Sequence, residues 1–379
     1  MKLREPLDRE AFSGWLDAFR WVAAAVVVIS HAGGVLMLPL TYVPTAERPL
    51  LQYGYSFVAG FAHYAVMIFF VMSGYLVGGS WVRDIGKGRA DIVVYLSKRL
   101  TRLGVVFYPV LLLTVPLMLL GQAIFPGAGT GIYPARAITS GDGLTLACNM
   151  AFLQDVLCPV AGGNDALWSL THEFWYYVAF PLLFFGWGGR VLAVAILALL
   201  TWFQTDNAPI LAYFLIWLIG VGVALCPYRR INAWAAVAAL AAVLVAARVL
   251  LHDAAGLIAL ATDMLVGSLF GLLLLALKSI PDLRPPPASS FQQAMAGFSY
   301  ALYCTHMPVL FLFSSISMAI FQVGGRTTPA SALHWVMVFS GIAFSFVIAF
   351  YFAKFTEAKT DAIRGLLAAN MPKIPVRSS

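Results

Sequence analysis

The chain has 379 residues, of which 61% are hydrophobic and only 11% are charged. Soluble domains are about half apolar and about a quarter charged, so this composition excludes an ordinary soluble domain and predicts an all-α protein with several membrane spans. The formal net charge of +7 is no argument for a nucleic-acid partner, because basic residues in membrane proteins mark the cytoplasmic side.

A transmembrane helix needs about 20 apolar residues. We predict a polytopic transmembrane helix bundle that forms one integral-membrane domain over residues 1–379, with short cytoplasmic tails at about 1–14 and 356–379 and no appended soluble domain. The ten predicted spans are residues 15–37, 56–80, 103–124, 168–186, 191–206, 210–226, 232–250, 256–277, 297–322 and 331–353.

The distribution of basic residues predicts the orientation. Ten spans place both termini on one side of the membrane. With the termini in the cytoplasm, nineteen of the 24 lysines and arginines fall in inner segments, and only Arg48, Arg136, Arg248 and Arg326 fall in outer ones. This asymmetry predicts cytoplasmic termini.

The four cysteines show no spacing typical of a zinc or redox site. Cys148 and Cys158 fall in one predicted external segment. A disulfide between them and two free thiols are both open alternatives.

The first predicted span carries a permanent cation, Arg20, and an imidazole, His31, eleven residues later. Eleven residues at about 100° each make three turns plus about 20°, so both side chains share one helix face, about 16 Å apart. A charge inside the membrane costs at least about 2.5 kcal/mol and normally faces a polar cavity. Alternatively, Arg20 reaches the lipid headgroups and His31 ends the helix beside Gly33 and Gly34. The shared face favours a polar passage through the bundle.

The Arg-x10-His spacing of this helix is similar to the signature of the membrane acyltransferase-3 family, and four further segments resemble elements of that family in the same order. They are "FFVMSGYLVGG" (Phe69–Gly79), "YLSKRLTRLGVVFYP" (Tyr95–Pro109), "LWSLTHEFWYYVAFP" (Leu167–Pro181) and "GFSYALYCTHMPV" (Gly297–Val309). The pattern departs from the family at Phe174, where a second acid often follows the glutamate, and beyond Glu357, where an expected proline is missing. We therefore assign no role to Glu357.

The resemblance implies an enzyme that moves an acyl group from cytoplasmic acyl-coenzyme A, with acetyl-coenzyme A as the first candidate, to a sugar hydroxyl of a bacterial surface or secreted glycan. It implies a multi-pass protein of the bacterial inner membrane, whose partners are the acyl donor, a glycan acceptor and the lipid bilayer, with no metal cofactor. The expected catalytic residues are His31 and Glu173, the expected coenzyme-binding residues are Arg20, Arg99 and Arg102, and the expected substrate-tunnel residues are Trp168, Ser299, Tyr303 and His306.

Each of these residues has a chemical rationale. A buried imidazole stays neutral and accepts a proton, so His31 suits a general base, although an acyl-histidine relay is also open. Guanidinium groups bind phosphate bidentately, but Arg99 and Arg102 are equally explained as residues that mark the inner face. Glu173, the only acid in its span, would orient His31, pair with an arginine or hold the acceptor.

Other assignments stay open. His306 is either a tunnel residue or a core histidine, and Ser73 with Gly74 is read as a close helix contact. Asp263 has no evident partner, and the histidines at 63, 252 and 334 match no family element. The competing hypothesis is a transporter or flippase that uses the same buried charges as a relay, and a related export protein without catalysis is a third.

Overall fold

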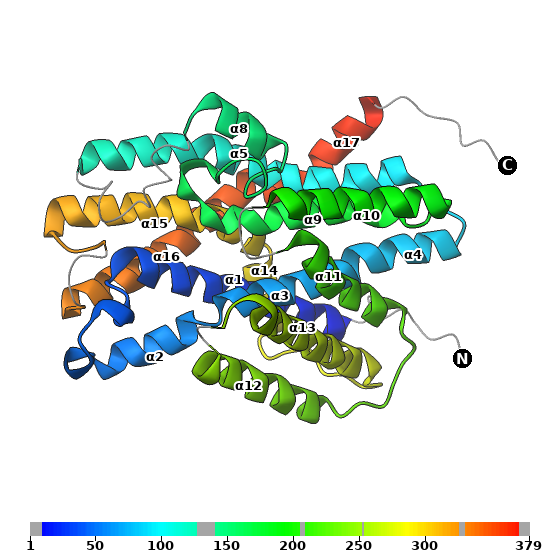
Figure 1. Cartoon of the computed structure of the whole chain (residues 1–379), viewed down its shortest axis with the longest axis horizontal. Helices are drawn as coiled ribbons and strands as arrows, with labels where there is room; N and C mark the ends of the chain where they lie inside the picture. Colours follow the sequence, from blue (N-terminus) through cyan, green and yellow to red (C-terminus); the bar gives the residue numbers. More distant parts are fainter. Residues whose placement is uncertain (1–9, 127–140, 205–208, 252–253, 326–329, 371–379) are drawn as a thin grey trace.

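The computed structural model describes residues 10–126, 141–204, 209–251, 254–325 and 330–370, and all regular structure in these ranges is helical (Figure 1). The all-α fold is therefore confirmed. The helices are α1 (Glu10–Leu36), α2 (Leu50–Ala59), α3 (Ala62–Ser73), the π-helix η4 (Gly74–Gly78), α4 (Gly79–Gly86), α5 (Ile92–Ile124), α8 (Gly143–Met150), α9 (Trp168–Leu182), α10 (Gly186–Phe203), α11 (Ile210–Leu225), α12 (Ala233–Leu250), α13 (Gly256–Ser279), α14 (Ser289–Ala296), α15 (Ser299–Phe321), α16 (Ala332–Phe355) and α17 (Thr360–Asn370). Short 3-10 turns are η2 (Leu40–Tyr42), η3 (Thr45–Glu47), η5 (Ala161–Gly163), η6 (Asp165–Leu167) and η7 (Glu357–Lys359).

Eight helical segments in the described ranges are long and apolar enough to cross a membrane. They correspond to eight of the ten predicted spans. The other two predicted spans contain α9 and α11, which have only 15 and 16 residues. The count of ten spans thus stays a prediction, while a multi-pass membrane protein is well supported.

The helices divide into a packed centre and a periphery. In α15, 61% of the most apolar window is buried, against 17% in both α10 and α12. α15 packs against α16, α5 and α1, and α1 also packs against α3. The peripheral helices leave apolar side chains exposed, as expected for helices that face lipid.

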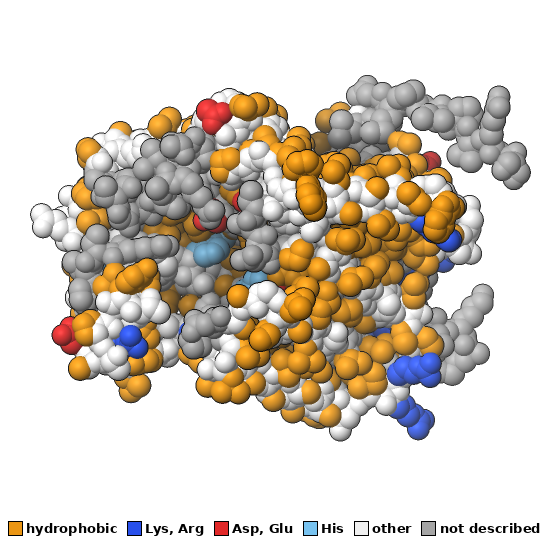
Figure 2. All heavy atoms as spheres, viewed as in Figure 1, with side chains coloured by type: hydrophobic (Ala, Val, Ile, Leu, Met, Phe, Trp, Pro, Cys, Tyr) orange, Lys and Arg blue, Asp and Glu red, His pale blue; other side chains and the backbone are white. Residues whose placement is uncertain are grey.

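Apolar side chains dominate one face of the molecule, and most of the basic side chains on that face gather toward one end (Figure 2). Hydrophobic side chains cover much of the face drawn in Figure 2, and most of the basic side chains visible there lie toward the right-hand end. Helix α1 begins and α17 ends toward the same side of the view (Figure 1). Which side of the membrane this end faces remains the prediction made from charge.

A loop bonds to α15 at a carbonyl whose helical hydrogen bond is lost to a proline within the helix. Pro308 lacks an N–H, so it leaves the carbonyl of Cys304 without its usual helical donor. The side-chain amide of Asn164 donates to that carbonyl at 3.0 Å, between η5 and η6. An unsatisfied backbone group inside a membrane costs several kcal/mol, so this bond fixes the loop against the second turn of α15.

The segment that leads to this loop is also cross-linked. Cys148 and Cys158 form a disulfide, so the first of the two alternatives holds. Asn149 bridges the same segment, because its amide nitrogen donates to the carbonyls of Thr145 and Pro159 and its oxygen accepts from the backbone of Ala161.

A buried acid ties three helices together, and the sequence had not indicated its partners. Asp263 of α13 lies 3.0 Å, through each carboxylate oxygen, from Nε2 of His63 at the start of α3. The hydroxyl of Tyr213 in α11 donates to the same carboxylate at 2.7 Å. The missing partner of Asp263 is therefore His63, which satisfies a carboxylate that is only 3% exposed.

Candidate functional site

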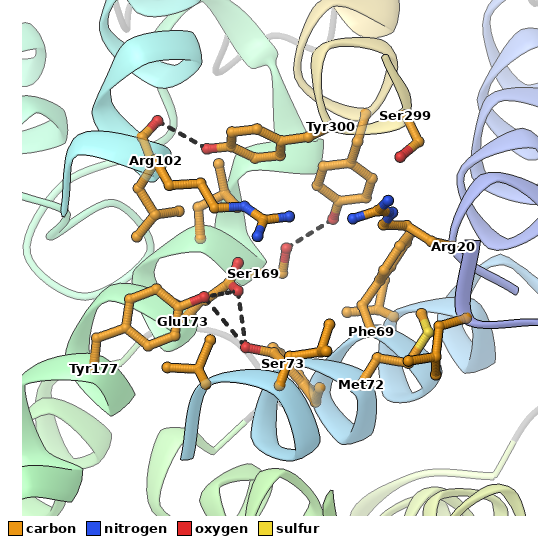
Figure 3. Close-up of a pocket in the computed structure, with 18 of the residues that line it drawn as sticks. Arg20, Phe69, Met72, Ser73, Arg102, Ser169, Glu173, Tyr177, Ser299 and Tyr300 are labelled. Carbon is orange, nitrogen blue, oxygen red and sulfur yellow. Dashed lines mark hydrogen bonds between the residues drawn. The ribbon is translucent and has the colours of Figure 1, made fainter. Parts of the chain in front are cut away.

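A cavity of about 340 Å³ lies between α1, α3, η4, α5, α9 and α15 (Figure 3). Its wall is largely apolar, with a small set of charged and hydroxyl side chains directed inward, which is the usual composition of a ligand site. The polar lining residues are Ser13, Asp17, Arg20, Ser73, Arg102, Ser169, Glu173, Tyr177, Ser299, Tyr300 and Tyr303.

Two arginines from different helices point into the cavity from opposite sides (Figure 3). Arg20 of α1 pairs with Asp17, one turn earlier, at 2.7 Å, and its buried Nε has no hydrogen-bond partner in the described part of the chain. Arg102 of α5 has neither an ion pair nor a hydrogen bond within the described residues. It is solvent-exposed and lines the cavity, so it marks the cavity's open side.

The one carboxylate of α9 is held by hydroxyl groups rather than by an arginine. Glu173 Oε1 accepts from Ser73 Oγ at 2.9 Å and from the hydroxyl of Tyr177 (Figure 3). Ser73 in turn accepts from the indole N–H of Trp217 at 3.1 Å. Within the described ranges, Glu173 forms no ion pair with Arg20 or Arg102. Its charge is therefore stabilised by donors while the two guanidinium groups stay separate from it.

The π-helix η4 brings Ser73 and the cavity wall close to α11. A Cβ atom on Gly74 would overlap the carbonyl of Trp217, and one on Gly220 would overlap the carbonyl of Val71. Glycine at both positions thus lets the two backbones touch, as expected for Gly74 from the sequence. Ser73 itself does more than allow packing, because it donates to Glu173.

The first turns of α15 form another wall. Ser299, Tyr300 and Tyr303 line the cavity, and the Tyr303 hydroxyl lies 2.8 Å from that of Ser169. The backbone N–H of Ala301 donates to Glu357 Oε2 at 3.3 Å, so this acid caps the start of α15. The ring of Tyr303 continues toward His306, with centroids 6.2 Å apart.

Two histidines meet beyond that wall. Nδ1 of His31 in α1 lies 2.7 Å from Nε2 of His306 in α15, and the two rings are nearly parallel, with an interplanar angle of 7°. Neither imidazole is among the residues that line the cavity. Tyr303 is the shared element, because it lines the cavity on one side and contacts His306 on the other.

The structure thus gathers most of the predicted site residues into two neighbouring groups. Arg20, Arg102, Glu173, Ser299 and Tyr303 line the cavity, and His31 and His306 form the pair beyond it.

Arg99 and Trp168 are predicted site residues that do not line this cavity. Arg99 turns to Ser80, to which it donates at 2.8 Å, and lies over the ring of Tyr95. Trp168 packs against Phe70 and His172.

Two cavity contacts were missed from the sequence, although one carried a signal. Asp17 precedes Arg20 by three residues on the same helix, a spacing that brings opposite charges together. Tyr177 follows Glu173 by four residues, but a tyrosine near a membrane interface has an equally good explanation as a lipid anchor. No group of three or more His, Cys, Asp or Glu residues that could hold a metal ion occurs in the described ranges.

The arrangement suits a charged ligand that enters a mostly apolar chamber and a reaction that needs a neutral base. An acyltransferase-domain family model matches residues 13–354, which is most of the chain. No curated protein and no solved structure matches the chain. With several helices able to cross a membrane and a match of this length, the chain belongs to the acyltransferase-3 family of membrane acyltransferases.

Proposed function

We propose that the protein is an integral-membrane O-acyltransferase, which transfers an acyl group from cytoplasmic acyl-coenzyme A to a hydroxyl of a cell-surface or secreted glycan. Acetyl-coenzyme A is the first candidate donor, and the bacterial inner membrane is the expected location. The proposal rests on the family membership, on the charge of the cavity and on the histidine pair next to it.

Arg20 and Arg102 are the proposed contacts for the phosphates of the donor. Planar guanidinium groups bind phosphate oxygens through parallel hydrogen bonds, and both side chains point into the cavity. Arg102 has no competing partner among the described residues, and Arg20 keeps a free Nε donor. Arg102 is therefore able to receive an anion without first breaking an ion pair with a described residue. Arg20 is able to do so through Nε while it keeps its contact with Asp17.

The apolar part of the cavity would take the uncharged arm of the donor and lead its acyl group toward Tyr303. A volume of about 340 Å³ lies at the lower end of the range for small-molecule sites, about 300–1,000 Å³. Side chains such as Met72, Leu76 and Leu103 supply this wall. A chamber of this size favours a short acyl group over a fatty acyl chain.

His31 is the proposed base for the transfer, with the thioester and the acceptor hydroxyl reaching it past Tyr303, which separates the cavity from the histidine pair. Its ring takes the proton from the acceptor hydroxyl, the oxygen forms a bond to the thioester carbonyl carbon, and the carbon–sulfur bond breaks. The imidazolium then returns the proton to the departing thiolate. General-base assistance of this kind is worth about 10²–10⁴-fold in rate. A relay through an acyl-histidine would use the same residue, and acid trapping of a labelled acyl-enzyme separates the two routes.

Glu173 is proposed to hold the acceptor. A carboxylate offers about four acceptor sites, and the hydroxyls of Ser73 and Tyr177 occupy only part of them. Sugar hydroxyls are suitable donors for the rest.

One observation carries the proposal: an arginine-lined cavity ends at Tyr303, whose other side contacts a hydrogen-bonded histidine pair. The test uses the full chain in lipid nanodiscs with acetyl-coenzyme A labelled in the acetyl group and a glycan fraction from the source membrane. We expect release of free thiol together with label in the glycan. Movement of label or solute across proteoliposomes without thiol release would instead support the transporter hypothesis.

A further inference from the structure

The contact between His31 and His306 determines where the hydrogens of both rings lie. The atoms Nδ1 of His31 and Nε2 of His306 are 2.7 Å apart, which is a hydrogen bond, so one of these two nitrogens carries the hydrogen and the other accepts it. Geometry at this single contact leaves both directions open. The other nitrogen of His306 decides between them.

The second nitrogen of His306, Nδ1, faces a backbone carbonyl. It lies 3.1 Å from the oxygen of Leu302, one turn earlier in α15. A carbonyl oxygen only accepts, so Nδ1 of His306 must donate. His306 is completely buried, and removal from water favours the neutral ring, which carries one N–H. Nε2 of His306 therefore has no hydrogen and acts as the acceptor toward His31.

The same assignment of donor and acceptor nitrogens then applies to His31. Because Nε2 of His306 accepts, Nδ1 of His31 carries the hydrogen and donates. In its neutral form His31 has only this one N–H, so its Nε2 holds the lone pair and can take up a proton. A general base requires this tautomer, in which the nitrogen without a hydrogen points away from the ring that orients it.

We propose that His306 is a positioning residue that fixes His31 in the Nδ1–H tautomer and makes Nε2 of His31 the atom that receives the acceptor proton. This rests on the proposed function for the role of His31. When Nε2 gains the proton and the O–H bond of the acceptor breaks, the His31 imidazolium keeps its Nδ1–H bond to His306, which stabilises the new charge. Nδ1 of His306 keeps its hydrogen bond to the Leu302 carbonyl throughout, so His306 neither gains nor loses a proton.

The position of His306 is itself well supported by the fold. Asn164 donates to the carbonyl of Cys304, two residues earlier, and the Tyr303 hydroxyl bonds to that of Ser169. Both contacts fix α15 against the segment 161–169 on the turn that carries His306. A neutral acceptor also suits this depth, because a carboxylate in the same role would have to be desolvated inside the bundle.

Two substitutions separate positioning from simple packing. His306→Gln keeps an amide oxygen near the place of Nε2, whereas His306→Leu has a similar volume and no acceptor. We expect His306→Leu to lower kcat about 10- to 100-fold, the loss known for partners that orient metal-binding histidines, with KM for the acyl donor unchanged. His306→Gln should recover most of that loss.

The tautomer of His31 is the measured property that a change in packing alone would not alter. The chain has only six histidines, so NMR of the protein in nanodiscs with nitrogen-isotope-labelled histidine is tractable, and the His31 signals are assigned by their loss in His31→Gln. We expect a protonated Nδ1 and a bare Nε2 at His31 in the wild type and in His306→Gln, and a mixture of tautomers in His306→Leu. A hydrogen on Nε2 of His31 in the neutral wild type, an unchanged tautomer in His306→Leu, or full activity of His306→Leu would overturn the proposal. If the wild type released no thiol from any acyl donor, the proposed function would fail while the tautomer result stood independently.

Discussion

The cavity and the histidine pair share helices α1 and α15 but have opposite chemical character. Arg20 and His31 both belong to α1, and Tyr303 and His306 both belong to α15. The cavity holds four charged side chains and reaches solvent at Arg102. The pair consists of two stacked rings joined by one hydrogen bond, with a fully buried His306.

The difference indicates a division of labour along the helix axis. Eleven residues of α1 separate Arg20 from His31, a rise of about 16 Å, and seven residues of α15 separate Ser299 from His306, a rise of about 10 Å. Both helices thus lead from the charged site to the neutral one in the same direction. A charged donor would bind where charge is tolerated, and the base would act where its neutral form is favoured.

Replacing the base should have the largest effect on the rate. His31→Gln keeps a polar side chain but removes the proton acceptor, so kcat should fall about 10²–10⁴-fold. Donor binding should persist, because His31 does not line the cavity. Thiol release measured at saturating acetyl-coenzyme A tests this, and an unchanged kcat would move the chemistry elsewhere.

Removing Arg102, which forms no ion pair with the described residues, should weaken donor binding instead. Arg102→Gln deletes a charge-assisted contact worth about 1.5–3 kcal/mol, so KM for the donor should rise about 10- to 100-fold. Within the described ranges it breaks no ion pair, unlike Arg20→Gln, which would leave Asp17 without its 2.7 Å partner. Arg89→Gln is the control, since Arg89 is an exposed arginine that does not line the cavity and whose ion pair with Asp84 is 3.7 Å long. Equal effects of the two substitutions on KM for the donor would mean that Arg102 acts only as a surface charge.

The proposed role of Glu173 predicts a change in KM for the acceptor rather than for the donor. Glu173→Gln keeps the shape and one acceptor oxygen for Ser73 and Tyr177, but it loses the charge and acceptor sites for a sugar. We expect KM for the acceptor to rise about tenfold, as for one lost hydrogen bond to a charged group, and KM for the donor to stay the same. Kinetics with each substrate varied in turn measure this. A change confined to KM for the donor would mean that Glu173 acts in donor binding together with the arginines.

A smaller effect is expected where the loop bonds to α15. Asn164→Ala leaves the carbonyl of Cys304 without a donor, at a cost of about 1–3 kcal/mol in stability. The midpoint of thermal unfolding in nanodiscs should fall, and kcat should fall less than in His306→Leu. An unchanged midpoint would mean that water replaces Asn164 at no cost.

The sequence predicted the helical class and the order of the helices because runs of apolar residues are local features. It also brought Arg20 and His31 onto one face, since the spacing within one helix fixes their relative angle. The contact between His31 and His306 joins residues 275 positions apart and was not predicted. Helices that are apolar on all sides give little information about which face meets which neighbour, so their rotation about the axis is decided by packing.

The same limit explains Arg99 and Asp263. Arg99 and Arg102 are one turn apart and looked equivalent, yet one bonds to Ser80 and the other faces the cavity. Asp263 and His63 are 200 positions apart, and only the packing of α3 against α13 makes them partners. The position of a residue along its helix was readable from the sequence, whereas the neighbouring helices were not.

The division between binding and chemistry is tested most directly by equilibrium binding of an unreactive thioether analogue of acetyl-coenzyme A to the wild type, His31→Gln and Arg102→Gln in nanodiscs. The account predicts that His31→Gln binds the analogue as tightly as the wild type, while Arg102→Gln binds it about 10- to 100-fold more weakly. Loss of binding in His31→Gln with unchanged binding in Arg102→Gln would contradict it.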